Sequence, residues 1–222
     1  MKINHLRIVV AVLSASMLFA GCSSKVAETD EYSGFLPDYS KLERTEIASG
    51  HEVLRWIAPG FKESAYRGIY ISPLVYYPAA KPNQRVSQDT LNKIKDYANL
   101  RLTNALAQRQ VLLPNPSGSR VLVAKVAITA VTAENKDMQY YEVIPVAAVI
   151  ATTMAASGNR TQNTVLFFEM NLVDKDTGKT VIAVVRKGYG KTIGDNNDPI
   201  TVNDVKQAID DMVKDVVNFP KS

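Results

Sequence analysis

The single cysteine of this 222-residue chain, Cys22, constrains the fold more than any other residue. One thiol cannot form an intrachain disulfide, and it excludes zinc sites that need several thiolates. Cys22 also ends an N-terminal stretch in which the basic residues Lys2 and Arg7 precede an apolar segment, residues 8–19. This order is typical of a secretory signal. The folded part of the chain is therefore expected after it, and its length fits one domain.

The apolar segment is too short to cross a bilayer as a helix. Its twelve residues would span about 18 Å, against about 30 Å for the hydrocarbon core. The sequence Phe19-Ala20-Gly21-Cys22 resembles the lipobox of bacterial lipoproteins, with Phe where Leu is usual. The resemblance implies that residues 1–21 are removed as a signal peptide and that Cys22 receives acyl chains such as palmitate. The alternatives are an uncleaved anchor, or a secreted protein whose cysteine stands there by chance.

The mature chain is expected at the outer membrane. Removing the signal discards Lys2 and Arg7 and lowers the formal net charge of +4 by two, so the charge indicates nucleic acid only weakly. Lipoproteins with Ser after the cysteine, as Ser23 here, usually go to the outer membrane, and the resemblance implies the same for this chain. Residues 22–33 are polar and are expected to form a lipidated tether that holds a domain at the periplasmic face.

Four blocks of the mature sequence resemble one family. The most specific block is GFLPDYS, residues 34–40, shortly after the lipid cysteine, and the others are residues 54–60, 66–74 and 172–178. They resemble a family of uncharacterised Gram-negative lipoproteins known as domain of unknown function 3313. The resemblance implies a lipoprotein whose single domain covers residues 34–222, and it implies no activity.

Hydrophobic periodicity predicts an α+β fold for this domain. Strands are expected in segments rich in alternating apolar residues, namely residues 68–77, 120–133, 163–174 and 180–187. Pro73 favours an edge position or a bulge in the first of them. Helices are expected from an N-cap at Ser87 to about residue 110, and over residues 202–217. The sequence thus predicts a single domain with a mainly antiparallel sheet of about four to five strands packed by two helices.

Three candidate catalytic or ligand-binding motifs lack residues that their chemistry requires. Residues 188–192 lack the Gly that a phosphate loop requires five residues before Gly190, where Val185 stands. Residues 195–198 lack the Gly and Glu partners of an EF-hand calcium loop. His51 is the only histidine after the signal, and no serine lies in a Gly-x-Ser-x-Gly elbow. We therefore predict no enzyme activity, no cofactor and no metal site, although a Ser–Lys dyad would leave no mark in the sequence.

Aromatic residues gather in the first third of the domain. Trp56, Tyr70 and Tyr76, with Arg55 nearby in the sequence, are side chains on which a glycan or a nucleic acid could stack. The periplasmic location disfavours nucleic acid. We interpret these residues as core and rim, with a groove for a ligand or for peptidoglycan as the alternative.

Residues 143–156 form an uncharged, apolar segment between two predicted strands. Three interpretations are open: a buried helix or loop, a surface for a protein partner or for self-association, or a part inserted into the membrane. A partner surface would consist of the larger side chains of the segment, which are Val143, Val146, Val149, Ile150 and Met154.

Taken together, these features predict an outer-membrane-anchored periplasmic lipoprotein with a binding or envelope-structural role and without catalysis. The alternative is a subunit of an oligomeric envelope assembly or transport complex that associates through residues 143–156. A hydrolase of unfamiliar type is the third possibility. The expected partners are the membrane, through Cys22, and an unknown envelope protein or a second copy of the chain.

Overall fold

The computed structural model describes residues 26–47, 50–135, 161–194 and 198–220. Its helices and strands are, in chain order, η1 (Thr29–Glu31), β1 (Glu43–Glu46), β2 (Glu52–Ile57), η2 (Glu63–Ala65), β3 (Gly68–Ile71), β4 (Val75–Tyr76), α1 (Gln88–Ala107), β5 (Val121–Asn135), β6 (Gln162–Asp174), β7 (Thr180–Ile193) and α2 (Val202–Val217). The two helices and the long strands lie where the periodicity predicts them.

Within the described residues, seven strands form one sheet in the order β1-β2-β7-β6-β5-β3, with β4 also paired to β5. The pairs among β5, β6 and β7 are antiparallel, as are those of β7 with β2 and of β2 with β1. β3 and β4 run parallel to β5, because α1 returns the chain along the sheet before β5 begins. The predicted α+β fold is confirmed, but the sheet has more than the four to five strands expected and is mixed.

The added strands have local causes. β1 has the sequence ERTE, which shows no apolar alternation, so its strand conformation depends on pairing with β2. The segment predicted as one strand over residues 68–77 is divided into β3 and β4, with Pro73 between them. Proline lacks the N–H that a ladder hydrogen bond needs, so the interruption follows from its chemistry.

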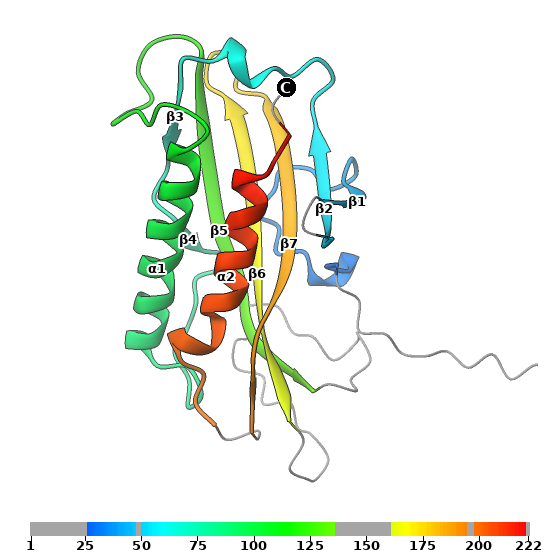
Figure 1. Ribbon diagram of the computed structural model, residues 1–222, viewed down its shortest axis with the longest axis vertical. Coiled ribbons are helices and arrows are strands. Elements are labelled where there is room, and N and C mark those ends of the chain that lie inside the picture. Colours follow the sequence, from blue (N-terminus) through cyan, green and yellow to red (C-terminus); the bar gives the residue numbers. More distant parts are fainter. Residues whose placement is uncertain (1–25, 48–49, 136–160, 195–197, 221–222) are drawn as a thin grey trace, which may run out of the picture.

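Both helices lie side by side on one face of the sheet (Figure 1). The Ser87 hydroxyl caps α1 as predicted and accepts a 3.1 Å hydrogen bond from the Thr90 N–H. Thr201 and Asp204 form a capping box at the start of α2. The apolar stripes of the two helices pack on the sheet around large, fully buried side chains, which include Leu91, Ile94, Leu122, Ile128, Leu166 and Ile209.

The opposite face of the sheet is covered by the N-terminal strap, by which we mean residues 26–42. Val26, Ala27 and Leu36 of the strap are buried in a second apolar cluster with sheet residues, among them Leu54, Ala130, Val165, Phe167, Ala183 and Val185. The tether expected over residues 22–33 is therefore too long, since the chain joins the domain from Val26 onward. Val26 and Ala27 are two apolar residues among polar neighbours. They give no periodic signal, so the sequence did not indicate that this part of the strap packs on the sheet.

Candidate functional site

An apolar cavity of about 220 Å³ lies between the two helices and the sheet. Its inner wall consists of aliphatic, aromatic and thioether side chains from both layers, such as Leu102, Leu122, Phe168, Met170, Ile209 and Met212. An apolar cavity of about 150 Å³ in another protein holds benzene, so this one has room for a larger apolar group. Among the described lining residues there is no serine, cysteine, lysine or histidine.

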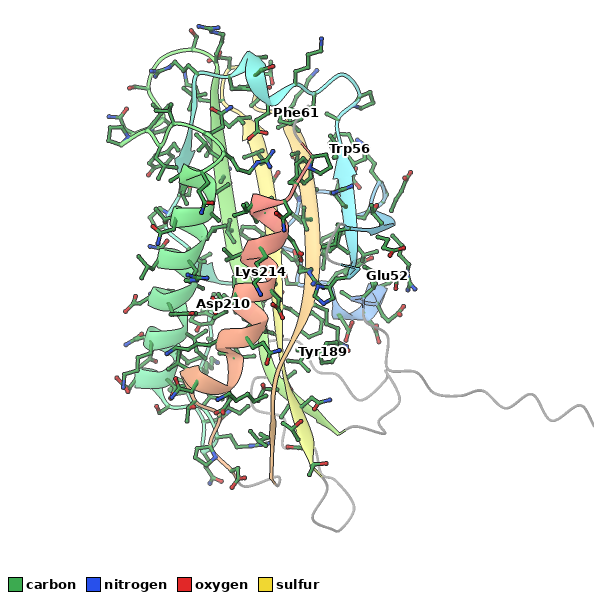
Figure 2. All side chains as sticks on the ribbon, viewed as in Figure 1. Glu52, Trp56, Phe61, Tyr189, Asp210 and Lys214 are labelled. Carbon is green, nitrogen blue, oxygen red and sulfur yellow. The ribbon has the colours of Figure 1, made fainter. Side chains whose placement is uncertain are left out.

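The packing of α2 on β7 explains where the cavity forms. A Cβ added to Gly190 would collide with the backbone oxygen of Asp204, and one added to Gly188 would collide with the side chain of Met212. Residues 188–192, rejected above as a phosphate loop, lie in β7, and the missing side chains at Gly188 and Gly190 let α2 approach the sheet there. Tyr189, labelled beside β7 in Figure 2, alternates onto the other face of the strand and packs with the apolar cluster under the strap. The cavity lies beside the second half of α2, where Val213 and Val216 line it.

The mouth of the cavity lies between β1 and the end of α2. Glu46 and Asn218 line the cavity here and are exposed, whereas the lining residues at the inner end are buried. Phe61, also in the lining, lies at the end of the molecule where α2 finishes (Figure 2). Arg55 on β2 and Phe219 after α2 complete the mouth, with the guanidinium 5.0 Å from the centre of the ring. That separation is typical of a cation–π contact.

Two buried ion pairs hold the walls near the mouth. Arg109 pairs with Glu63 and donates a 3.1 Å hydrogen bond to the carbonyl of Val217, at the end of α2. Arg186 on β7 pairs with Asp215 on α2 at 3.1 Å. The side chains are 6% and 17% exposed in the first pair and 9% and 12% in the second. Because a carboxylate matches each guanidinium, these pairs fix the end of α2 and add no net charge to the cavity.

Arg55 differs from these two arginines. No carboxylate of the described residues forms an ion pair with it, and it lies over the ring of Phe219. Burial lowers the pKa of Arg55, because the charged guanidinium loses hydration, although an arginine stays charged at neutral pH. Its cross-strand neighbour Glu43 is exposed. The mouth of an apolar cavity therefore carries one partly buried positive charge that no described carboxylate matches.

The three aromatic residues predicted to form a groove do not meet. Trp56 lies on β2 toward one edge of the sheet (Figure 2), with the Lys41 ammonium 5.1 Å from its ring centre. Tyr70 lies on β3 at the far edge, and β7, β6 and β5 separate the two strands. The Tyr76 hydroxyl donates a 2.7 Å hydrogen bond to the carbonyl of Leu91, and burial raises the pKa of Tyr76. Neighbours in sequence are thus distributed over opposite edges of the sheet.

Of the other residues singled out in the sequence, the structure describes His51 but not Cys22 or residues 143–156. Cys22 and the segment of residues 143–156 lie outside the described residues, so lipidation and a partner surface stay predictions. His51 is partly buried next to β2, and its backbone carbonyl accepts a 2.8 Å hydrogen bond from the N–H of Ile47. Within the described part of the chain, no three potential metal ligands gather, and no helix has the length and apolarity needed to span a membrane.

Sequence reasoning missed the cavity, although two signals for it were present. One was the pair Val53 and Arg55, which alternate onto the same face of β2 and both line the cavity. The other was Gly188 and Gly190, whose spacing of two places both on one face of a strand, where a helix can approach. Neither signal shows by itself that the end of α2 leaves space over the sheet.

Comparison with known proteins identifies the family. The model of the family described as a protein of unknown function, DUF3313, matches residues 31–216. The chain belongs to the DUF3313 family. The uncharacterized lipoprotein YdcL of Escherichia coli strain K12 is 44% identical to this DUF3313 protein over 210 residues, which cover 95% of this chain and 94% of YdcL. YdcL of Escherichia coli O157:H7 matches to the same extent. The family resemblance found in the sequence is confirmed.

Solved structures also match this DUF3313 protein. A PelC dodecamer from Paraburkholderia phytofirmans matches with a TM-score of 0.36 and 9% identity, over 75% of this chain and 98% of the PelC chain. A putative neuraminyllactose-binding hemagglutinin homolog from Helicobacter pylori matches with a TM-score of 0.34 and 8% identity, over 72% of this chain and 82% of that chain.

Proposed function

We propose that the protein is an outer-membrane lipoprotein, anchored at Cys22, whose periplasmic domain binds an apolar small molecule in the helix–sheet cavity without transforming it. The observation that carries the proposal is the apolar wall of the cavity. Ligand sites in proteins are typically concave and mostly apolar, with a few polar groups at defined positions. This cavity has that composition, with its charged groups gathered toward the mouth.

Two observations support the anchor. The relatives in Escherichia coli are lipoproteins that align with nearly the whole chain. The strap begins at Val26, only four residues after Cys22, and it is packed on the sheet. Four residues extend at most about 14 Å, so a lipidated Cys22 would hold the domain close to the membrane surface. Ser23 supports the outer membrane as the destination.

Binding without catalysis is supported by the chemistry of the lining. The described lining offers no hydroxyl, thiol, amine or imidazole nucleophile. Of its three carboxylates, Glu63 and Asp215 are held in ion pairs with Arg109 and Arg186, and Glu46 is exposed at the mouth. General acid–base catalysis needs a group whose pKa lies near the working pH, and arginine does not meet that need. The site is therefore suited to hold a ligand.

The test measures binding of the neutral fluorophore N-phenyl-1-naphthylamine to the full-length lipidated protein in detergent-free peptidiscs. Ala98 is buried in α1 and lines the cavity, so Ala98→Phe should fill it and abolish saturable binding. Leu100→Phe is the matched control, because Leu100 is on the same helix and 57% exposed. Ala98→Leu fills less of the cavity and should weaken binding. A thermal melt checks that this variant is folded. Unchanged binding in both Ala98 variants would refute the proposal.

A further inference from the structure

We infer that the ligand is a single-chain anionic amphiphile, with its acyl chain in the cavity and its carboxylate or phosphate head beside Arg55. This inference rests on the proposed function and adds the chemical class of the ligand. It joins two observations that the proposed function leaves separate, namely the apolar wall and the unmatched guanidinium at the mouth.

The shape and size of the cavity favour one chain. The cavity runs from the exposed mouth at Glu46 and Asn218 to an inner end lined by Ile69 and Leu122, which are 2% and 1% exposed. A ligand that fills it must be apolar along its inner part and can be polar where it reaches the mouth. The volume of about 220 Å³ is below the 300–1,000 Å³ usual for the pockets of drug-sized ligands, which favours one narrow chain over a two-tailed lipid.

The polar end of the ligand is specified by Arg55. A guanidinium presents a planar fork of N–H donors that matches the two oxygens of a carboxylate or phosphate. The Phe219 ring is within cation–π distance of the group, and such a contact uses the face of an aromatic ring rather than a hydrogen-bond acceptor. The ring contact leaves the N–H edge of Arg55 available for a hydrogen-bond acceptor, and no carboxylate of the described residues forms an ion pair with it. Partial burial makes an anionic partner more valuable there than at an exposed site.

The other charges at the mouth do not provide that partner. Glu63 and Asp215 are paired with Arg109 and Arg186, so their charges are already matched. Glu43 lies opposite Arg55 in the register of β1 and β2, and Glu46 lines the mouth, but both are exposed and neither forms an ion pair with Arg55. The Glu43 charge, opposite Arg55 in the register, would repel an anionic head. Removing the Glu43 charge should therefore tighten binding of an anionic chain.

Fatty acids carry a carboxylate head and lysophospholipid-like molecules carry a phosphate, and both satisfy the same geometry. Three twelve-carbon photoreactive probes distinguish them: a diazirine-bearing dodecanoic acid, the dodecyl phosphate and the neutral dodecanol. Each is titrated against the full-length lipidated protein in peptidiscs. After irradiation, mass spectrometry maps the adducts, and those on peptides that contain Leu102 or Met170 report the inner wall of the cavity.

We expect at least one anionic probe to label the inner wall with a half-saturating concentration about tenfold below that of dodecanol, since a charge-assisted hydrogen bond accounts for about that factor. Arg55→Gln should remove the advantage and Arg55→Lys should keep part of it, whereas Glu43→Gln should increase it. Arg101→Gln is the control, because Arg101 is a similarly exposed arginine that pairs with Asp210 on the helices. The stronger of the two anions identifies the head group.

Two results would overturn the inference in distinguishable ways. If acid, phosphate and alcohol label the inner wall equally, or if Arg101→Gln acts as strongly as Arg55→Gln, the head-group assignment fails and the apolar site stands. If no chain labels the inner wall, the proposed function fails with it.

Discussion

The hydroxyl of Tyr39 in the strap donates a 2.5 Å hydrogen bond to the carboxylate of Glu169 in β6, 130 residues later in the chain. Glu169 is fully buried, and its other oxygen accepts a 3.0 Å hydrogen bond from the N–H of Ser33. The Tyr39 oxygen in turn accepts from the N–H groups of Gly34 and Leu36. The GFLPDYS block therefore forms a hydrogen-bonded turn around one tyrosine, which attaches the strap to the sheet.

Replacing Tyr39 by Phe tests this attachment. The ring is kept and the donor is lost, so the buried Glu169 carboxylate loses a charge-assisted hydrogen bond worth about 1.5–3 kcal/mol. We expect the free energy of unfolding in urea to fall by that amount. Tyr77→Phe is the control, because Tyr77 is 41% exposed and also lies on the sheet side near Phe35 of the strap. Equal losses in the two variants would contradict the specific role of Tyr39.

The same contact makes stability depend on alkaline pH. Burial, with the hydrogen bond to Glu169 second, raises the pKa of Tyr39 from its ordinary value of 10.0 to about 12. A group whose pKa is higher in the folded state stabilises fully below its unfolded pKa and loses that stabilisation as the pH rises through the folded one. Unfolding free energy should therefore decline between pH 10 and 12, and less steeply in Tyr39→Phe. An identical decline in the variant and the wild type would refute the assignment to Tyr39.

A buried ion pair fixes the beginning of the strap. The Lys187 ammonium lies 3.2 Å from the Glu31 carboxylate, and the two side chains are 4% and 2% exposed. Lys187→Met leaves the buried Glu31 charge without this partner, which should cost about 3–5 kcal/mol in chemical denaturation. Lys214→Met, at a surface pair on α2 that is 66% exposed on the lysine side, should cost less than about 1 kcal/mol.

The double variant Lys187→Met with Glu31→Gln separates the pair from its surroundings. Because removing both charges leaves no isolated one, the double variant should be more stable than the sum of the two single changes predicts. Strict additivity would show that the two groups do not depend on each other.

The sequence predicted the helices better than the contacts between layers. The stripe of α2 over residues 202–217 and the Ser87 cap of α1 are local patterns, and both were confirmed because local periodicity and capping determine them. The strap, β1 and the Arg55–Phe219 contact depend on residues far apart in the chain. Glu169 alternates with apolar residues in β6, which by itself favours a solvent-facing position, and it is buried because the strap covers that face of the sheet.

The apolar segment of residues 143–156 provides a test of the alternative role in an assembly. A photo-crosslinking residue at Val149 of the full-length lipidated protein should give a discrete adduct in cells if the segment contacts a partner or a second copy. The mass of the adduct would tell these two apart. Intramolecular coupling alone would indicate that the segment packs within its own domain and would oppose the assembly role. Leu100, exposed on α1, is a control position for nonspecific capture.

The approach of α2 to β7 predicts unequal effects for two glycines. An added Cβ at Gly190 meets the backbone oxygen of Asp204, which can move only with the helix, whereas at Gly188 it meets the flexible end of Met212. Gly190→Ala should therefore cost about 1–3 kcal/mol of unfolding free energy, as overpacking does, and Gly188→Ala clearly less. Displacing the first half of α2 should also change the cavity beside its second half. We therefore expect the affinity for the neutral fluorophore to change in Gly190→Ala at a temperature where the variant is folded. Equal stability losses with unchanged affinity would show that these glycines do not set the distance between helix and sheet.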